Sequence, residues 1–176
     1  MKYSSYKYIT FNPNPSQKVQ KSLLLFIFCA LLGVIACNGT MNLVPTDLKQ
    51  YGIPLTIMSP EGAKVVAEDL GGNIGLTIQK DKFDVQVMAI TIGAASAAAF
   101  IQEKKTELQG SDPTFKIIDE DEDGFVYETK NGEHATYNFS FVKFLGDKHY
   151  TFQTGFTALP TQAEAEEMYK AVRSAK

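Results

Sequence analysis

The chain of 176 residues has no tryptophan and two cysteines, Cys29 and Cys37, and it lacks the common catalytic and nucleotide-binding motifs. The nucleophile-elbow, P-loop, H-E-x-x-H and G-x-G-x-x-G patterns are all missing. Because no cysteine follows Cys37, the rest of the chain forms no internal disulfide and must be stabilised by its core. We therefore expect that the protein is not an enzyme, with a hydrolase whose catalytic residues are scattered along the chain as an alternative.

Positive charge is also scarce in the larger part of the chain. After Cys37 there are thirteen basic and twenty acidic residues, which gives this part a net charge of −7. Binding to the phosphates of a nucleic acid needs clustered lysine and arginine. The composition therefore argues against nucleic acid as a partner.

The sequence has one long apolar run, Leu23–Cys37, which follows Lys18 and Lys21. A basic segment, an apolar segment and small residues before a cleavage site are the layout of a secretory signal. The run has about fifteen residues, whereas a membrane-spanning helix needs about twenty. A transmembrane helix is the alternative, but basic residues flank only the N-terminal side of the run.

The run ends in Val34-Ile35-Ala36-Cys37, which resembles the lipobox of bacterial lipoproteins. The resemblance implies that residues 1–36 are a signal peptide that is removed, that Cys37 receives a diacylglycerol, and that the new N-terminus receives an acyl chain. Asn38, in place of Asp, implies sorting to the outer membrane, facing the periplasm. We expect an envelope protein whose partners are the membrane, through the lipid anchor, and an unidentified envelope protein or small ligand, with no other cofactor.

The remaining chain divides into a short segment and one domain. Residues 37–51 contain Gly, Thr, Asn and Pro without clear periodicity, and we interpret them as a lipidated tether. Residues 52–176 have the length of a single domain.

The first half of this domain favours strands. Ile53–Met58 predicts a strand that ends at a turn over residues 59–62. Residues 63–69 fit either a helix or a strand, and we favour a strand. Apolar residues alternate with polar ones over residues 74–79 and 83–92, which predicts a hairpin.

Two segments favour helices. Ser96–Gln109 has apolar residues at helical spacing and stops before Gly110. Thr161 and Glu164 form a capping box at the start of a C-terminal amphipathic helix. We expect this last helix to pack on the apolar face of a sheet.

Strands are predicted between the helices, over residues 114–118, 125–129, 135–145 and 150–156. In the last two, aromatic residues alternate with hydroxyl and amide side chains. One sheet face is therefore expected to be an aromatic core, and the other a polar face in water. The polar residues are our candidates for a binding surface: Thr136, Asn138, Ser140, Thr151 and Gln153.

The order strands, helix, strands, helix predicts an α+β fold, a mainly antiparallel sheet packed by two helices. The early strand ending at Ser59-Pro60, the central helix, the aromatic stretch Tyr150-Thr151-Phe152 and the closing helix resemble the Mog1/PsbP-like sandwich. This resemblance, over residues 51–176, implies a non-catalytic binding or assembly factor.

The sharpest local motif is the acidic loop 119–124. Asp119, Asp121 and Asp123 match ligand positions of an EF-hand calcium loop. Lys130 stands where the bidentate glutamate belongs, and the flanking segments favour strands rather than helices. We interpret the loop as a solvated acidic turn, with calcium or small-ligand binding there as the alternative.

The two histidines, His134 and His149, lie beside predicted turns and have no cysteine, histidine or serine at a recognisable spacing. We expect both to be exposed and to lack a catalytic or metal-binding role. The sequence as a whole predicts a lipid-anchored envelope protein whose single domain binds or scaffolds a partner.

Overall fold

The computed structural model describes residues 41–69, 73–90, 96–157 and 159–176 of the chain, which belong to one compact unit, Met41–Lys176. The predicted signal peptide and Cys37 lie outside the described residues. The elements are, in chain order, β1 (Leu43–Asp47), the 3-10 turn η1 (Lys49–Tyr51), β2 (Thr56–Pro60), β3 (Lys64–Asp69), β4 (Ile74–Lys80), β5 (Phe83–Ile90), α2 (Ala97–Ser111), β6 (Lys116–Glu120), β7 (Gly124–Asn131), β8 (His134–Leu145), β9 (Lys148–Thr154) and α3 (Gln162–Arg173).

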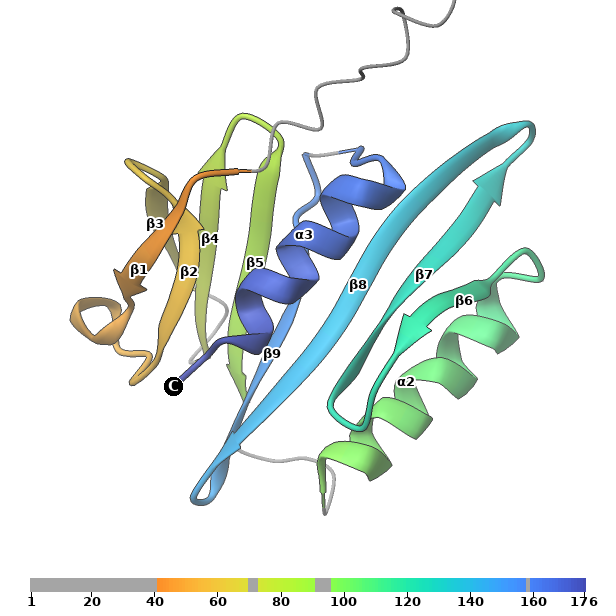
Figure 1. The fold of residues 1–176 in the computed structure, drawn as a ribbon. Coiled ribbons are helices and arrows are strands. Elements are labelled where there is room, and N and C mark those ends of the chain that lie inside the picture. The colour runs from red at the N-terminus through yellow and green to blue at the C-terminus, as the bar shows by residue number, and fades with distance from the viewer. Residues whose placement is uncertain (1–40, 70–72, 91–95, 158) are drawn as a thin grey trace, which may run out of the picture. The chain divides into compact units, whose positions relative to one another are not determined.

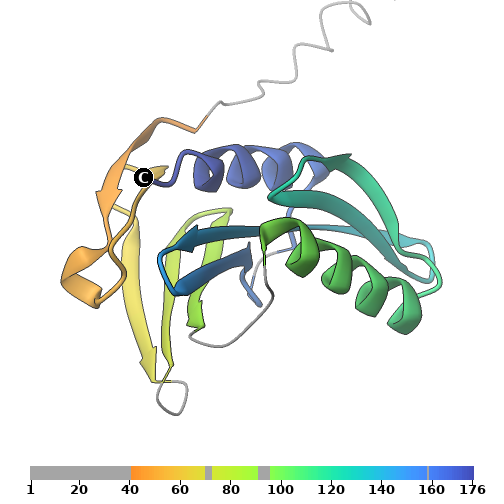
Figure 2. The ribbon, with the colours of Figure 1, turned by 90° about the horizontal axis from the view of Figure 1, so that it is seen from below.

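The described residues form nine strands in two antiparallel sheets and two α-helices, which confirms the predicted α+β class. β1 and β2 pair as a separate two-stranded sheet. The other seven strands form one sheet in the order β3-β4-β5-β9-β8-β7-β6 (Figure 1). Figure 2 shows α3 and α2 on opposite faces of this sheet.

The hairpin of β4 and β5 shows how alternation in the sequence becomes one buried face. Leu76 pairs opposite Val87 and Ile78 opposite Val85, and all four side chains are buried. Because successive side chains of a strand point to opposite faces, the residues between them face away from this core. The predicted hairpin is confirmed, and so is the strand predicted over residues 63–69, which is the edge strand β3.

The larger core lies between the sheet and α3, where the predicted aromatic face is buried. Phe139, Phe141 and Phe152 are at most 3% exposed. Tyr169 of α3 packs against Phe139, with 6.1 Å between the ring centroids. Each fully buried Phe stabilises the fold by about 1.5–3 kcal/mol, so aromatic contacts are a main support of α3.

The start of α3 follows the prediction in detail. The backbone N–H of Glu164 donates to Thr161 Oγ1 at 3.4 Å, and the N–H of Thr161 donates to Glu164 Oε2 at 2.7 Å. Both halves of the predicted capping box are therefore present. The apolar stripe of Ala165, Met168 and Val172 is fully buried.

α2 is held less firmly than α3. Ser96 caps its first turn, and the helix ends at Ser111, two residues beyond the predicted end. Ile101 is the one buried residue of α2, and it packs with Phe125 and Val142 in a second, smaller core. This core lies on the sheet face opposite α3.

The tether predicted over residues 37–51 is wrong where the structure describes it. β1 occupies Leu43–Asp47 and pairs with β2, and Leu48 is fully buried. The sequence does not suggest a strand here, because Pro45 has no backbone N–H to donate to a neighbouring strand and proline is tolerated only at the edge of a sheet. The folded domain therefore begins about ten residues earlier than the sequence suggests.

Two predicted strands are also displaced. β2 is Thr56–Pro60 rather than Ile53–Met58, so Pro60 belongs to the strand and not to the turn. Leu55 is fully buried although it precedes β2, because burial and strand pairing are separate requirements. β6 similarly begins two residues after its predicted start, at Lys116.

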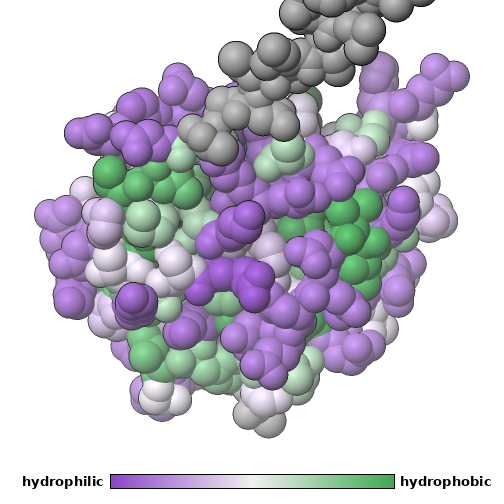
Figure 3. Space-filling view, in the orientation of Figure 1, coloured by the Kyte–Doolittle hydropathy of each residue, from purple (hydrophilic) through white to green (hydrophobic). Residues whose placement is uncertain are grey.

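The surface carries few large apolar side chains. No helix among the described residues is both long enough and apolar enough to span a membrane. On the face of Figure 1, apolar patches are separated by hydrophilic side chains (Figure 3). The exposed large apolar residues of the described chain are Val66, Ile74, Leu145, Phe156 and Leu159.

Candidate functional site

A cavity of about 310 Å³, which we call the α2 pocket, lies between α2 and the sheet face that this helix covers. Its volume is at the lower end of the range of about 300–1,000 Å³ typical of ligand sites. The residues that α2 contributes are Phe100, Glu103, Lys104 and Glu107. The strands contribute Met88 and Ile90 from β5, Ser140 from β8, and His149, Thr151 and Gln153 from β9.

The sheet register sets the rows of the pocket floor. Gln153 pairs opposite Gln86 on one side and Ser140 on the other, and Thr151 pairs opposite Met88. The Gln153 amide donates to Gln86 Oε1 at 3.0 Å. One row across β5, β9 and β8 is therefore polar, and the next row mixes a hydroxyl with an apolar side chain.

Thr151 is the most distinctive residue of this floor. It is 6% exposed, and its hydroxyl has no hydrogen-bond partner among the described residues. A buried hydroxyl that forms no hydrogen bond costs about 1–3 kcal/mol. A bound molecule that hydrogen-bonds Thr151 would recover this free energy.

His149 lies at the apolar end of the pocket and is 4% exposed, so the prediction of an exposed histidine is wrong. Its ring stacks on Phe144, with 5.2 Å between centroids, and lies 5.5 Å from the ring of Phe100. Burial lowers the pKa of His149 from its ordinary value of 6.5, so the imidazole is neutral at pH 7 and offers one donor and one acceptor. His134, by contrast, is exposed as predicted.

The predicted binding-surface residues are only partly brought together. Ser140, Thr151 and Gln153 line the α2 pocket, whereas Thr136 and Asn138 lie outside it. The expectation that this face is in water is wrong for Ser140 and Thr151, which are buried. The reason is that a helix covers this part of the sheet, which strand alternation alone does not reveal.

Sequence reasoning missed the apolar lining, Met88, Ile90 and Phe100. One signal was present in β5, where the side chains between the core residues change from Asp84 and Gln86 to Met88 and Ile90. A polar face that becomes apolar along one strand indicates that something covers its far end.

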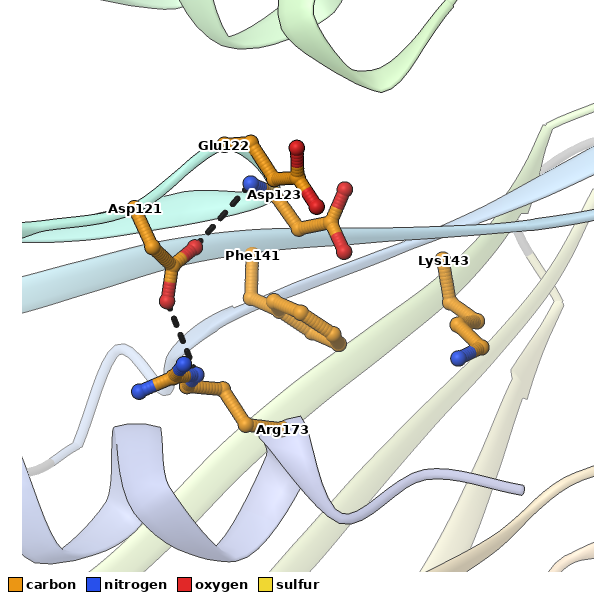
Figure 4. A pocket seen from close by; sticks show the side chains of 6 residues that line it. All are labelled: Asp121, Glu122, Asp123, Phe141, Lys143 and Arg173. Atoms are coloured by element: carbon orange, nitrogen blue, oxygen red, sulfur yellow. Dashed lines mark hydrogen bonds and ion pairs between the residues drawn. The ribbon is translucent and has the colours of Figure 1, made fainter.

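The acidic loop borders a second, open hollow of about 430 Å³ (Figure 4). Arg173 Nε lies 2.8 Å from Asp121 Oδ2, and the N–H of Asp123 donates to Asp121 Oδ1 at 3.0 Å. Asp121 therefore already has a cation and a backbone donor as partners. A calcium ion at this carboxylate would have to displace Arg173.

The three calcium candidates are not assembled into a site. Asp119 belongs to β6 and pairs with Val126, so the turn is shorter than the predicted 119–124. Within the described residues, no group of three His, Cys, Asp or Glu side chains is placed to hold a metal ion. Asp121 and Asp123 line the hollow without Asp119.

The contacts around Tyr169 connect the acidic loop to α3. The Arg173 guanidinium lies 5.5 Å from the Tyr169 ring centroid. Burial raises the pKa of Tyr169, and the Asp121 carboxylate raises it further. A Cβ at Gly124 would lie 2.5 Å from the Ser140 carbonyl oxygen, so only glycine fits where the loop enters β7.

Comparisons with family models, with curated proteins and with solved structures give no match to this chain.

Proposed function

We propose that this chain is a lipid-anchored protein of the bacterial cell envelope whose domain binds a small ligand in the α2 pocket without catalysing a reaction. Cys37 carries a diacylglycerol and an acyl chain in this proposal, and the domain faces the periplasm from the outer membrane. The observation that carries the binding role is the buried hydroxyl of Thr151 on the floor of a cavity, which has no hydrogen-bond partner within the described part of the chain.

The anchor is supported by the sequence Val34-Ile35-Ala36-Cys37 after an apolar run with basic residues before it. Several acyl chains give stable membrane attachment, which one chain does not. Attachment confines the domain to one surface and so raises its effective concentration toward anything bound there.

The lining of the α2 pocket favours a small, flat, uncharged ligand. Phe100 and His149 offer aromatic surfaces, and Thr151 offers a hydroxyl. At the helix side, Lys104 and Glu107 lie 2.9 Å apart, and Glu103 leaves this wall with one net negative charge, which disfavours an anionic ligand. A ring that carries one hydroxyl or amide group matches this combination of walls and floor.

A binding role rather than a catalytic one is supported by the same groups. A hydroxyl nucleophile needs a base within about 2.6–3.2 Å, and the Thr151 hydroxyl has no such partner among the described residues. His149 is enclosed by the aromatic rings of Phe144 and Phe100.

We also propose that the fold is the Mog1/PsbP-like sandwich. The support is the central antiparallel sheet with a helix on each face, together with the separate β1–β2 pair. Proteins of that fold are mostly binding or assembly factors, which is compatible with the proposed role although a fold does not fix a function.

Ligand-observed NMR with small phenols and benzamides tests the pocket, using the full-length protein. Thr151→Val removes the hydroxyl and keeps the side-chain shape. Thr77→Val is the matched control, because Thr77 lies on the same sheet face, opposite Gln86, but outside the pocket. We expect Thr151→Val to weaken binding about three- to tenfold, the value of one hydrogen bond, and Thr77→Val to leave it unchanged.

Binding by none of these compounds, or an equal effect of both substitutions, would contradict the pocket assignment.

The anchor is tested separately by the intact mass of the protein and by membrane fractionation beside a Cys37→Ser variant. Release of the variant into the soluble fraction is expected, and unchanged fractionation would overturn the anchor.

A further inference from the structure

Two apolar side chains of the segment that joins β9 to α3 project into solvent. Phe156 is 85% exposed and Leu159 is 77% exposed. The other exposed large apolar residues of the described chain are at most 40% exposed. Single exposed apolar residues are common, but two this open in one short connection form a surface that requires an explanation.

Hydrogen bonds hold this connection in place. Thr157, between the two, donates to Asp84 Oδ2 from its backbone N–H at 3.2 Å and from its hydroxyl at 2.5 Å. The N–H of Gly155 donates to the Asp84 carbonyl oxygen at 2.8 Å. Asp84 is 1% exposed, so a buried carboxylate fixes the segment at Thr157, while Thr157 and Phe156 are both exposed.

This connection lies at the end of the domain where the described chain begins. The N–H of Met41 donates to Glu167 Oε1, in the second turn of α3, at 2.7 Å. Figure 1 shows the start of the described chain and the connection from β9 to α3 at the same end, and the turn between β8 and β9 at the opposite end. The strand register also separates the two ends of β9. Thr154, which leads into the connection, pairs with Val85 near the start of β5, whereas His149, next to the turn from β8, pairs with Ile90 at the end of β5.

The distance along the chain to the expected anchor is short. Cys37 precedes Met41 by four residues, which span at most about 14 Å when fully extended. A lipid on Cys37 therefore keeps this end of the domain within reach of the headgroups. The opposite end, with Leu145, remains on the far side of the domain.

We propose that Phe156 and Leu159 enter the surface of the lipid bilayer that holds the anchor, and so fix the orientation of the domain on the membrane. This inference rests on the lipid anchor of the proposed function. Charge at this end is mixed, with Lys80 and Lys82 beside Asp81, so the contact is apolar rather than a response to anionic lipid. The insertion of a few apolar side chains is a modest interaction, and the anchor makes it persistent by raising the local concentration of lipid.

The absence of tryptophan makes a direct test possible. Phe156→Trp places the sole tryptophan of the protein at the proposed contact, and aromatic residues of this kind favour the membrane interface. Leu145→Trp is the matched control, because Leu145 is exposed at the opposite end. Both variants are purified as full-length, lipid-bearing protein and reconstituted into phosphatidylcholine vesicles with brominated acyl chains, and the mass of each confirms the lipid on Cys37.

We expect the emission of the Phe156→Trp protein to shift to shorter wavelength and to lose intensity in brominated vesicles, while the Leu145→Trp protein shows neither change. Equal quenching of the two lipid-bearing variants, or none in either, would overturn the bilayer contact and leave the anchor intact. A mass without lipid on Cys37 would overturn both the anchor and the contact that depends on it, so the two failures are distinguishable.

Discussion

Replacing Thr151 by valine should stabilise the ligand-free protein. Valine keeps the branched shape of threonine and suits a strand equally well. The hydroxyl that it removes is buried and has no partner among the described residues, so the folded state recovers about 1–2 kcal/mol of desolvation cost. For a domain of this size, 1 kcal/mol corresponds to about 3–4 °C, so we expect Tm to rise by about 3–8 °C.

The matched control is Thr154→Val, on the same strand. Thr154 is also 6% exposed, but its Oγ1 accepts a hydrogen bond from the N–H of Phe139 at 3.1 Å. Valine there leaves a buried N–H without a partner, which costs about 1–3 kcal/mol and lowers Tm. Calorimetry on both variants without ligand shows whether the Thr151 hydroxyl lacks a hydrogen bond in the ligand-free protein. A decrease in Tm for both would mean that the Thr151 hydroxyl forms a hydrogen bond in the ligand-free protein, and the α2 pocket would then lack the group proposed to bind a ligand.

Three other predictions follow from buried groups. A Cβ at Gly155 would lie 1.9 Å from Asp84 Oδ1, so Gly155→Ala should lower the free energy of unfolding by about 1–3 kcal/mol in denaturant titrations. A Cβ at Gly110 would meet no atom of the described residues within 4 Å, so the control Gly110→Ala should raise the free energy of unfolding by up to about 1 kcal/mol. Because burial lowers the pKa of His149, the unfolded chain binds a proton more readily, so stability should fall as pH drops below 6.5 and His149→Gln should reduce this fall in Tm. The raised pKa of Tyr169 has the opposite consequence: stability is lost as pH rises above 10, and Tyr169→Phe should lessen alkaline unfolding followed by circular dichroism.

The elements that the sequence predicts well are those whose signals are local. The capping box of Thr161 and Glu164 and the apolar stripe of α3 lie within a few turns of one helix. The predicted hairpin of β4 and β5 and the predicted strands β8 and β9 carry an alternation of apolar and polar side chains that is typical of strands. These features require no knowledge of what lies beside them in space.

The features that were missed depend on neighbours far away in the chain. β1 is a strand because β2 pairs with it, and Pro45 within β1 makes a strand there hard to predict from the sequence. His149 is buried because Phe100, from α2, lies over it. The polar face of β8 and β9 becomes a pocket floor only where that helix covers it, and the weak apolar stripe of α2 does not say which face it covers.

The unequal hold on the two helices has a consequence for motion. α3 contributes five buried residues to its core: Ala165, Met168, Tyr169, Ala171 and Val172. α2 contributes Ile101 alone, so its local opening should cost less free energy, and its amide hydrogens should exchange with solvent sooner than those of α3. Because α2 is also a wall of the cavity, opening the helix and admitting a ligand become a single event. A bound molecule would then raise the free energy of opening α2 by RT ln(1 + [L]/Kd) and slow amide exchange there accordingly, so occupancy of the pocket would be measured as protection of one helix.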